Sequence, residues 1–330
     1  MNKLKTIGVS ALCGTLAAVS AHAGEMTVSG SANVTYMTKE KATTGAPLGI
    51  TTGMTFAGSG ELDNGNAVAV NIFHDDQNAF SSADVSIDVA GIGTFSVDQG
   101  GGTGLDRLDD KTPTAWEEPY DAGLGSNIVT ATGVGASTDI ELAISGDMLP
   151  EGLAAYISYA PEAGAGAVND KATGGGDSGL GRGYDIVLEH SGLADGLNVF
   201  GGISKIDDER GNDRSQRVLG FSFAAGPVTF GAQHLKDELG SNTVDYYDNM
   251  AFGVSFLVND NLSLSYGEHK SERATEAASK VELTASSLQA AYTMGGATFR
   301  VARSKVDNAN YSTAANNDYD VSLVGMALAF

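Results

Sequence analysis

The chain has 330 residues, with 41 acidic against 19 basic side chains, a formal charge of −22, and a single cysteine. So acidic a protein is a poor partner for nucleic acid, and one cysteine excludes a disulfide framework. After residue 23 no run of 18 apolar residues occurs, which excludes a transmembrane helix.

Residues 1–23 have the pattern of a secretory signal peptide. Lys3 and Lys5 precede an apolar run over 7–19, and the segment ends in an Ala-His-Ala cleavage pattern. We expect cleavage after Ala23. The mature chain, 24–330, then carries 17 basic and 41 acidic residues, a formal charge of −24.

The next residues alternate between apolar and polar side chains. In 26–38, MTVSGSANVTYMT, and in 83–99, ADVSIDVAGIGTFSVDQ, an apolar face lies opposite a polar or acidic one. This period of two predicts strands. An oily face opposite a carboxylate face is typical of a barrel with lipid outside and water inside, and among β structures only a closed barrel can span a bilayer.

Connections between the strands are predicted to alternate in length. Short ones lie at 62–65, 90–93, 146–152, 191–196, 224–227, 259–261 and 295–296, and long ones at 40–47, 75–82, 100–138, 161–182, 207–215, 237–247, 270–279 and 306–317. These connections join sixteen strands with roughly 10 residues for each membrane span. We predict an all-β, up-and-down antiparallel transmembrane barrel with both termini on one side.

Two segments leave this assignment open. Residues 127–138 read either as a further strand or as the tail of the third long connection. In 280–294 the apolar positions change phase between Leu283 and Leu288, for which we expect a β-bulge.

The chain ends in VSLVGMALAF, a strand pattern that continues to Phe330. A last strand that pairs with the first explains this ending. No linker or repeat divides the chain, so we expect a single domain over 24–330.

Together these features resemble a Gram-negative general porin, with the closest likeness to the alphaproteobacterial type. The hairpin SIDVAGIGTFSVDQGGG is similar to the one that leads into the third loop of those porins. The resemblance implies a homotrimer in the outer membrane, a water-filled pore, and a third loop folded into the lumen. It also implies that Phe330 is part of a signal for the barrel-assembly machinery.

The resemblance makes the long connection 100–138 the candidate pore constriction. Its candidate residues are Asp106, Arg107, Asp109, Asp110, Lys111, Glu117, Glu118 and Asp121. Six carboxylates against two bases favour cations over anions. The plainer interpretation is a solvated surface loop.

Strand positions opposite the oily face give a second set, the lumen wall. Its candidates are Asp84, Asp88, Asp98, Asp139, Glu141, Asp185, Glu189 and Arg300. Arg300 is the one strand base that clearly falls at such a position. General porins have a basic cluster on the wall, so this scarcity of bases departs from the family pattern. Because screening acts over about 8–10 Å, ions in a narrow eyelet feel these charges, whereas acids at wide vestibules matter little.

The sequence predicts passive diffusion of ions and small hydrophilic solutes, with outer-membrane lipid as surroundings and no cofactor. Alternatives are a channel selective for a cationic or sugar solute, a barrel enzyme, and a secreted β-sandwich that binds calcium or glycan. No H-E-x-x-H or G-x-S-x-G motif supports an enzyme. Loop-bound calcium at Asp75-Asp76 or at Asp207-Asp208-Glu209 with Asp213 is a weaker alternative to solvated loops.

Overall fold

A computed structural model describes residues 26–41, 45–76, 81–109, 111–121, 124–164, 179–208, 211–240, 243–275, 277 and 279–330. The signal peptide predicted over 1–23, with its cleavage site at Ala23, lies outside the described residues. Among those residues, no helix is long and apolar enough to cross a membrane.

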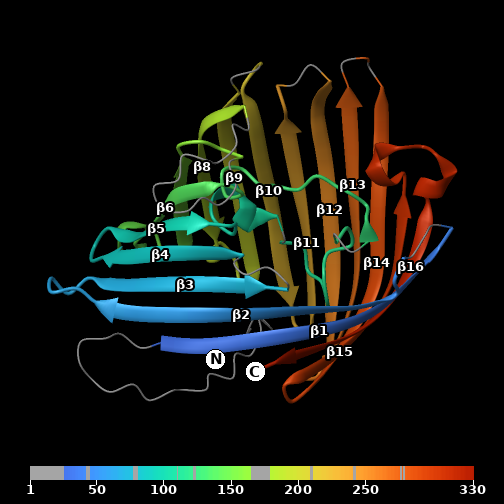
Figure 1. Cartoon of the computed structure of the whole chain (residues 1–330), viewed down its shortest axis with the longest axis horizontal. Coiled ribbons are helices and arrows are strands. Elements are labelled where there is room, and N and C mark those ends of the chain that lie inside the picture. The colour runs from blue at the N-terminus through green and yellow to red at the C-terminus, as the bar shows by residue number, and fades with distance from the viewer. Residues whose placement is uncertain are drawn as a thin grey trace.

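Sixteen antiparallel strands form one closed barrel, in which each strand pairs with its chain neighbours and β1 pairs with β16 (Figure 1). The strands are β1 (Met26–Glu40), β2 (Leu48–Glu61), β3 (Ala67–Asp75), β4 (Ser82–Val89), β5 (Gly93–Gln99), β6 (Thr138–Ile144), β7 (Leu153–Ala160), β8 (Leu180–His190), β9 (Leu197–Asp208), β10 (Arg214–Ala225), β11 (Val228–Glu238), β12 (Val244–Asn259), β13 (Leu262–Thr275), β14 (Lys280–Met294), β15 (Ala297–Asp307) and β16 (Tyr319–Ala329). The predicted strand number and topology are confirmed.

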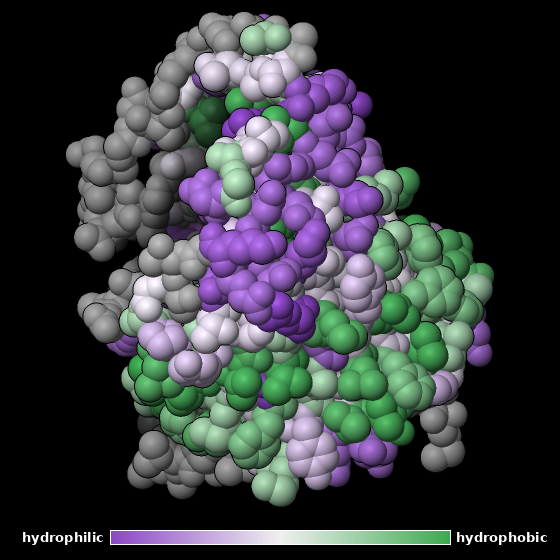
Figure 2. Space-filling model, turned by 90° about the vertical axis from the view of Figure 1, so that its right-hand side faces the viewer, coloured by the Kyte–Doolittle hydropathy of each residue, from purple (hydrophilic) through white to green (hydrophobic). Residues whose placement is uncertain are grey.

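The outer surface divides into an apolar band and a charged rim. Large apolar side chains such as Leu219 and Leu288 are exposed on the strands. On the face that Figure 2 shows, hydrophobic residues gather toward one end of the molecule. Toward the other end, cross-strand ion pairs such as Arg217–Glu238 (3.3 Å) face outward. A lipid-facing band beside a polar rim is what a membrane barrel requires.

The strand lengths differ from the prediction in both directions. They range from the 7 residues of β5 to the 16 of β12, rather than about 10 each. As a result, the connection 276–279 is shorter than the connection 145–152, and the expected alternation of lengths is only partial.

The structure decides the two segments that the sequence left ambiguous, 127–138 and 280–294. Residues 127–137 form no strand, so they belong to the third loop and the count stays at sixteen. Every residue of β14 is described, and its pairing has no register shift, so the predicted bulge is wrong. Leu283 is apolar because it points inward, where it packs with Leu124, Tyr311 and Val321.

Candidate functional site: the third loop and the inner wall

The third loop, residues 100–137, crosses the barrel in Figure 1 and runs along the inner face of many strands. On its outgoing limb the Ala115 N–H donates to Ser265 Oγ on β13 at 2.9 Å. On its returning limb the Asn249 side chain on β12 donates to the Val129 carbonyl. Ser265 and Asn249 lie on the face opposite the exposed apolar side chains, so the loop is held from the inside of the wall.

Two predicted wall carboxylates on β6 hold the root of this loop. Asp139 accepts a hydrogen bond from the Thr103 hydroxyl at 2.8 Å. Glu141 accepts one from the Gly104 N–H at 2.8 Å and pairs with Arg107. Asp139 and Glu141 are only 1% and 5% exposed, so they lie on the inner face beneath the loop.

A third wall carboxylate, Asp185 on β8, joins both limbs of the loop. It accepts the N–H of Leu105 at 2.7 Å from the outgoing limb and the N–H of Val134 at 2.9 Å from the returning limb. Next to it, Gln216 on β10 accepts the Gly133 N–H at 2.7 Å. Because a buried N–H without an acceptor is costly, these wall side chains determine where the loop lies.

The remaining predicted wall acids form a row across neighbouring strands. Asp84 on β4 is directly opposite Asp98 on β5, and Asp98 is directly opposite Asp139 on β6. Asn71 donates to Asp84 at 2.9 Å, whereas Asp88 is exposed. Carboxylates in direct opposition repel one another, and Asp98 also accepts the Gly101 N–H at 3.1 Å from the root of the loop.

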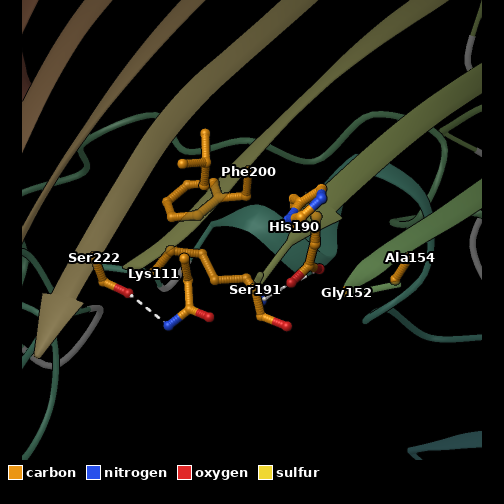
Figure 3. A pocket seen from close by; sticks show the side chains of 10 residues that line it. Lys111, Gly152, Ala154, His190, Ser191, Phe200 and Ser222 are labelled. Atoms are coloured by element: carbon orange, nitrogen blue, oxygen red, sulfur yellow. Dashed lines mark hydrogen bonds and ion pairs between the residues drawn. The ribbon is translucent and has the colours of Figure 1, made fainter. Parts of the chain in front are cut away.

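Lys111 and Glu189 form an ion pair on one side of the loop (3.3 Å). They line a cavity that also includes His190, Phe200 and Ser222, and Figure 3 shows the Lys111 side chain lying across it. Lys111 is therefore largely balanced by a wall carboxylate.

The other acids of the loop have different surroundings. Asp106 accepts the Gly102 N–H at 2.7 Å and so caps its own turn, and Glu118 accepts the Thr112 hydroxyl at 2.8 Å. The Asp109 carbonyl accepts the Tyr120 hydroxyl at 3.2 Å. Asp110, a predicted constriction residue, lies outside the described residues.

Glu117 and Arg300 face each other at the far end of the loop. Burial raises the pKa of Glu117 to about 7, with the Asp121 carboxylate acting in the same direction and Arg300 opposing it. The Arg300 guanidinium lies 5.9 Å from the Trp116 ring centroid. Together with Asp121, these residues line one cavity.

Sequence reasoning missed three inward bases, so the prediction of Arg300 as the one clear wall base is wrong. Lys39 donates to the Leu124 carbonyl at 2.7 Å, Arg214 pairs with Asp237 at 2.7 Å, and Arg273 donates to the Tyr311 carbonyl at 3.1 Å. Arg214 and Arg273 fell in segments predicted as loops. Had the predicted strands been extended to include these residues, the alternation would have placed them on the inner face.

No cluster of three or more His, Cys, Asp or Glu side chains suited to a metal ion occurs in the described part of the chain. Glu209 of the weaker calcium prediction lies outside that part, and the prediction stays untested.

Comparisons with known proteins agree with this architecture. The profile of a family described as Gram-negative porin matches residues 8–298. A comparison with curated proteins found no match.

Three solved structures illustrate the shared fold. Salmonella typhi OmpF in complex with daunomycin is 15% identical, with coverage of 93% of this chain and 98% of that chain and a TM-score of 0.67. The anion-selective porin from Comamonas acidovorans is 16% identical, with coverage of 93% and 100% and a TM-score of 0.61. A mutant of Rh. blastica porin is 16% identical, with coverage of 92% and 100% and a TM-score of 0.57. At such identities the likeness concerns the fold alone.

Proposed function

Because this chain belongs to the Gram-negative porin family, we propose that it is a passive, cation-preferring outer-membrane channel for ions and small hydrophilic solutes. The observation that carries the proposal is a closed barrel, apolar outside, whose inner face holds a long acidic loop beside a row of opposed carboxylates. It acts as a channel and not as an enzyme.

The cation preference is supported by how the charges are paired. Arg107, Lys111 and Arg214 are each bonded to a wall carboxylate, which reduces their effect on passing ions. Asp84 and Asp98 lie in opposition to each other with no base in the same row. An ion in a narrow passage therefore meets an excess of negative charge.

A narrowed pore is part of the same proposal. Hydrogen bonds from the loop to Asp185, Gln216, Ser265 and Gln289 support an inward constriction, with the passage running between the loop and the wall of β2–β5.

We further propose a homotrimer, export by the signal peptide of residues 1–23, and recognition of Phe330 by the barrel-assembly machinery. One solved structure with this fold, from Vibrio cholerae, is described as a trimer form of OmpT. The exposed apolar side chains of the barrel exterior offer surface to lipid and to neighbouring subunits, which supports such an assembly.

The test is a planar-bilayer recording under a KCl gradient with purified, folded protein. Stepwise conductance and a reversal potential of cationic sign are expected. If folded protein gives no conductance, the proposed channel function is wrong. Conductance with an anionic potential contradicts the cation preference alone.

A further inference from the structure

We infer that the cavity between the third loop and strands β1, β2, β15 and β16 is a binding subsite for a neutral, polyhydroxylated solute of about hexose size. This inference rests on the proposed channel, since the solute reaches the cavity through the pore. The cavity measures about 450 Å³, within the usual range for small-molecule sites.

Its loop side is held rigidly. A single wall side chain, Gln289, accepts the backbone N–H groups of Trp116 at 2.9 Å and Glu117 at 3.3 Å, and its Nε2 donates to the Glu117 carbonyl at 2.6 Å. Trp116 also packs closely against Gly325. Side chains fixed in this way lose little entropy when a ligand binds, which favours a binding site over a loose loop tip.

Arg300 supplies donors that lack acceptors within the described structure. Its side chain is half-buried, its Nε is buried without a hydrogen-bond partner among the described residues, and its guanidinium bonds to no described side chain. Glu117 acts on it through charge only. A buried donor without an acceptor is costly, so a ligand oxygen placed here is favoured.

The opposite wall offers further polar groups of modest size. Asn33 and Thr35 on β1 and Thr51 on β2 line the cavity, and Met37 and Leu323 add apolar surface. Trp116, the only tryptophan of the chain, provides an aromatic surface for the C–H groups of a ring.

The cavity holds charges of both signs, so an ion of either sign meets at least one group that repels it. Arg300 repels a cation, whereas Asp121 and, above its pKa, Glu117 repel an anion. A neutral solute with many hydroxyls can accept from the arginine and donate to the carboxylates at once. Hydroxyls, unlike a single carboxylate or ammonium, satisfy both.

Three probes of similar size and different charge test this assignment: glucose, gluconate and glucosamine. Each is titrated onto open channels in KCl, and the reduction of current and the added current noise are measured. Saturable reduction is expected at a lower concentration for glucose than for either charged analogue. Gluconate or glucosamine acting at the lowest concentration overturns the neutral class, and a strictly linear effect of glucose overturns the subsite.

Two variants locate the effect. Arg300→Gln and Trp116→Leu should each raise the half-saturating glucose concentration about tenfold, as expected for the loss of one hydrogen bond to a charged group or a comparable contact. Arg217→Gln, an arginine of the outer face, is the matched control and should behave as wild type. Unchanged glucose binding in both variants contradicts the site.

The outcomes separate this inference from the proposed function. If wild-type protein gives no conductance, the proposed channel function itself is wrong. Channels that conduct but show no saturable glucose effect leave the porin in place and remove only the subsite. If a variant fails to fold, the comparison of the three probes on wild-type channels still decides.

Discussion

Phe330 and Gly30 exchange hydrogen bonds in both directions: the Gly30 N–H donates to the Phe330 carbonyl at 2.7 Å, and the Phe330 N–H donates to the Gly30 carbonyl at 3.0 Å. The last residue of the chain is therefore part of the seam that closes the barrel. The Phe330 ring also covers Gly30, where an added Cβ would lie 2.5 Å from the ring.

Replacing Gly30 with valine should disturb this seam, because the new side chain occupies the space of the Phe330 ring. We expect a smaller fraction of folded, heat-modifiable protein on electrophoresis. Gly58→Val is the control, since a Cβ at Gly58 has open space around it. Equal folding of the two variants would show that the packing of the Phe330 ring against Gly30 is not required for folding.

Replacing Asp185 with alanine should loosen the third loop. The N–H groups of Leu105 and Val134 would lose their acceptor, at a cost of about 1–3 kcal/mol each. We expect greater open-channel noise in single-channel recordings. Asp84→Asn, a wall carboxylate bonded to Asn71 instead of the loop, should keep wild-type noise. Equal noise in both variants would contradict the anchoring role.

Cation preference should rise with pH through about 7. The raised pKa of Glu117 means that this carboxyl is neutral below that pH and charged above it. Reversal potentials measured from about pH 6 to pH 8 should show the step. Glu117→Gln should remove it, and Glu118→Gln should retain it. A step that persists in Glu117→Gln must come from another group.

Neutralising the acids of the loop together should weaken cation preference. The variant replaces four aspartates with asparagine and two glutamates with glutamine: Asp106, Asp109, Asp110, Asp121, Glu117 and Glu118. Because Asp106 caps its own turn, the set without Asp106 should fold better with nearly the same loss of selectivity. Unchanged selectivity would assign control to Asp84 and Asp98.

The outer half of the fold follows from the sequence, and the inner half does not. Lipid requires an apolar side chain at every outward position. The outward orientation of Val85 and Leu288 can therefore be predicted from their hydrophobicity alone. Inward residues meet either water or the third loop. Leu283 is apolar because it packs beneath a returning loop, which no local pattern reveals.

The candidate site shows the same limit. Parity alone identified Asp139, Glu141 and Asp185 as inward. Their role as acceptors for N–H and hydroxyl groups of the loop depends on contacts between residues 36 to 80 positions apart. Such contacts are set by tertiary packing, and a sequence pattern of period two carries no information on them.

The loop is bonded to wall side chains on β1, β6, β8, β10, β12, β13 and β14: Lys39, Asp139, Glu141, Asp185, Gln216, Asn249, Ser265 and Gln289. Inner positions of β2 to β4, such as Thr55 and Ser86, are not among these fastenings. The bonds that hold the loop and the inner positions of β2 to β4 therefore belong to different parts of the wall. Substitutions at inner positions of β2 to β4 would change the lining of the barrel without removing any of these loop bonds.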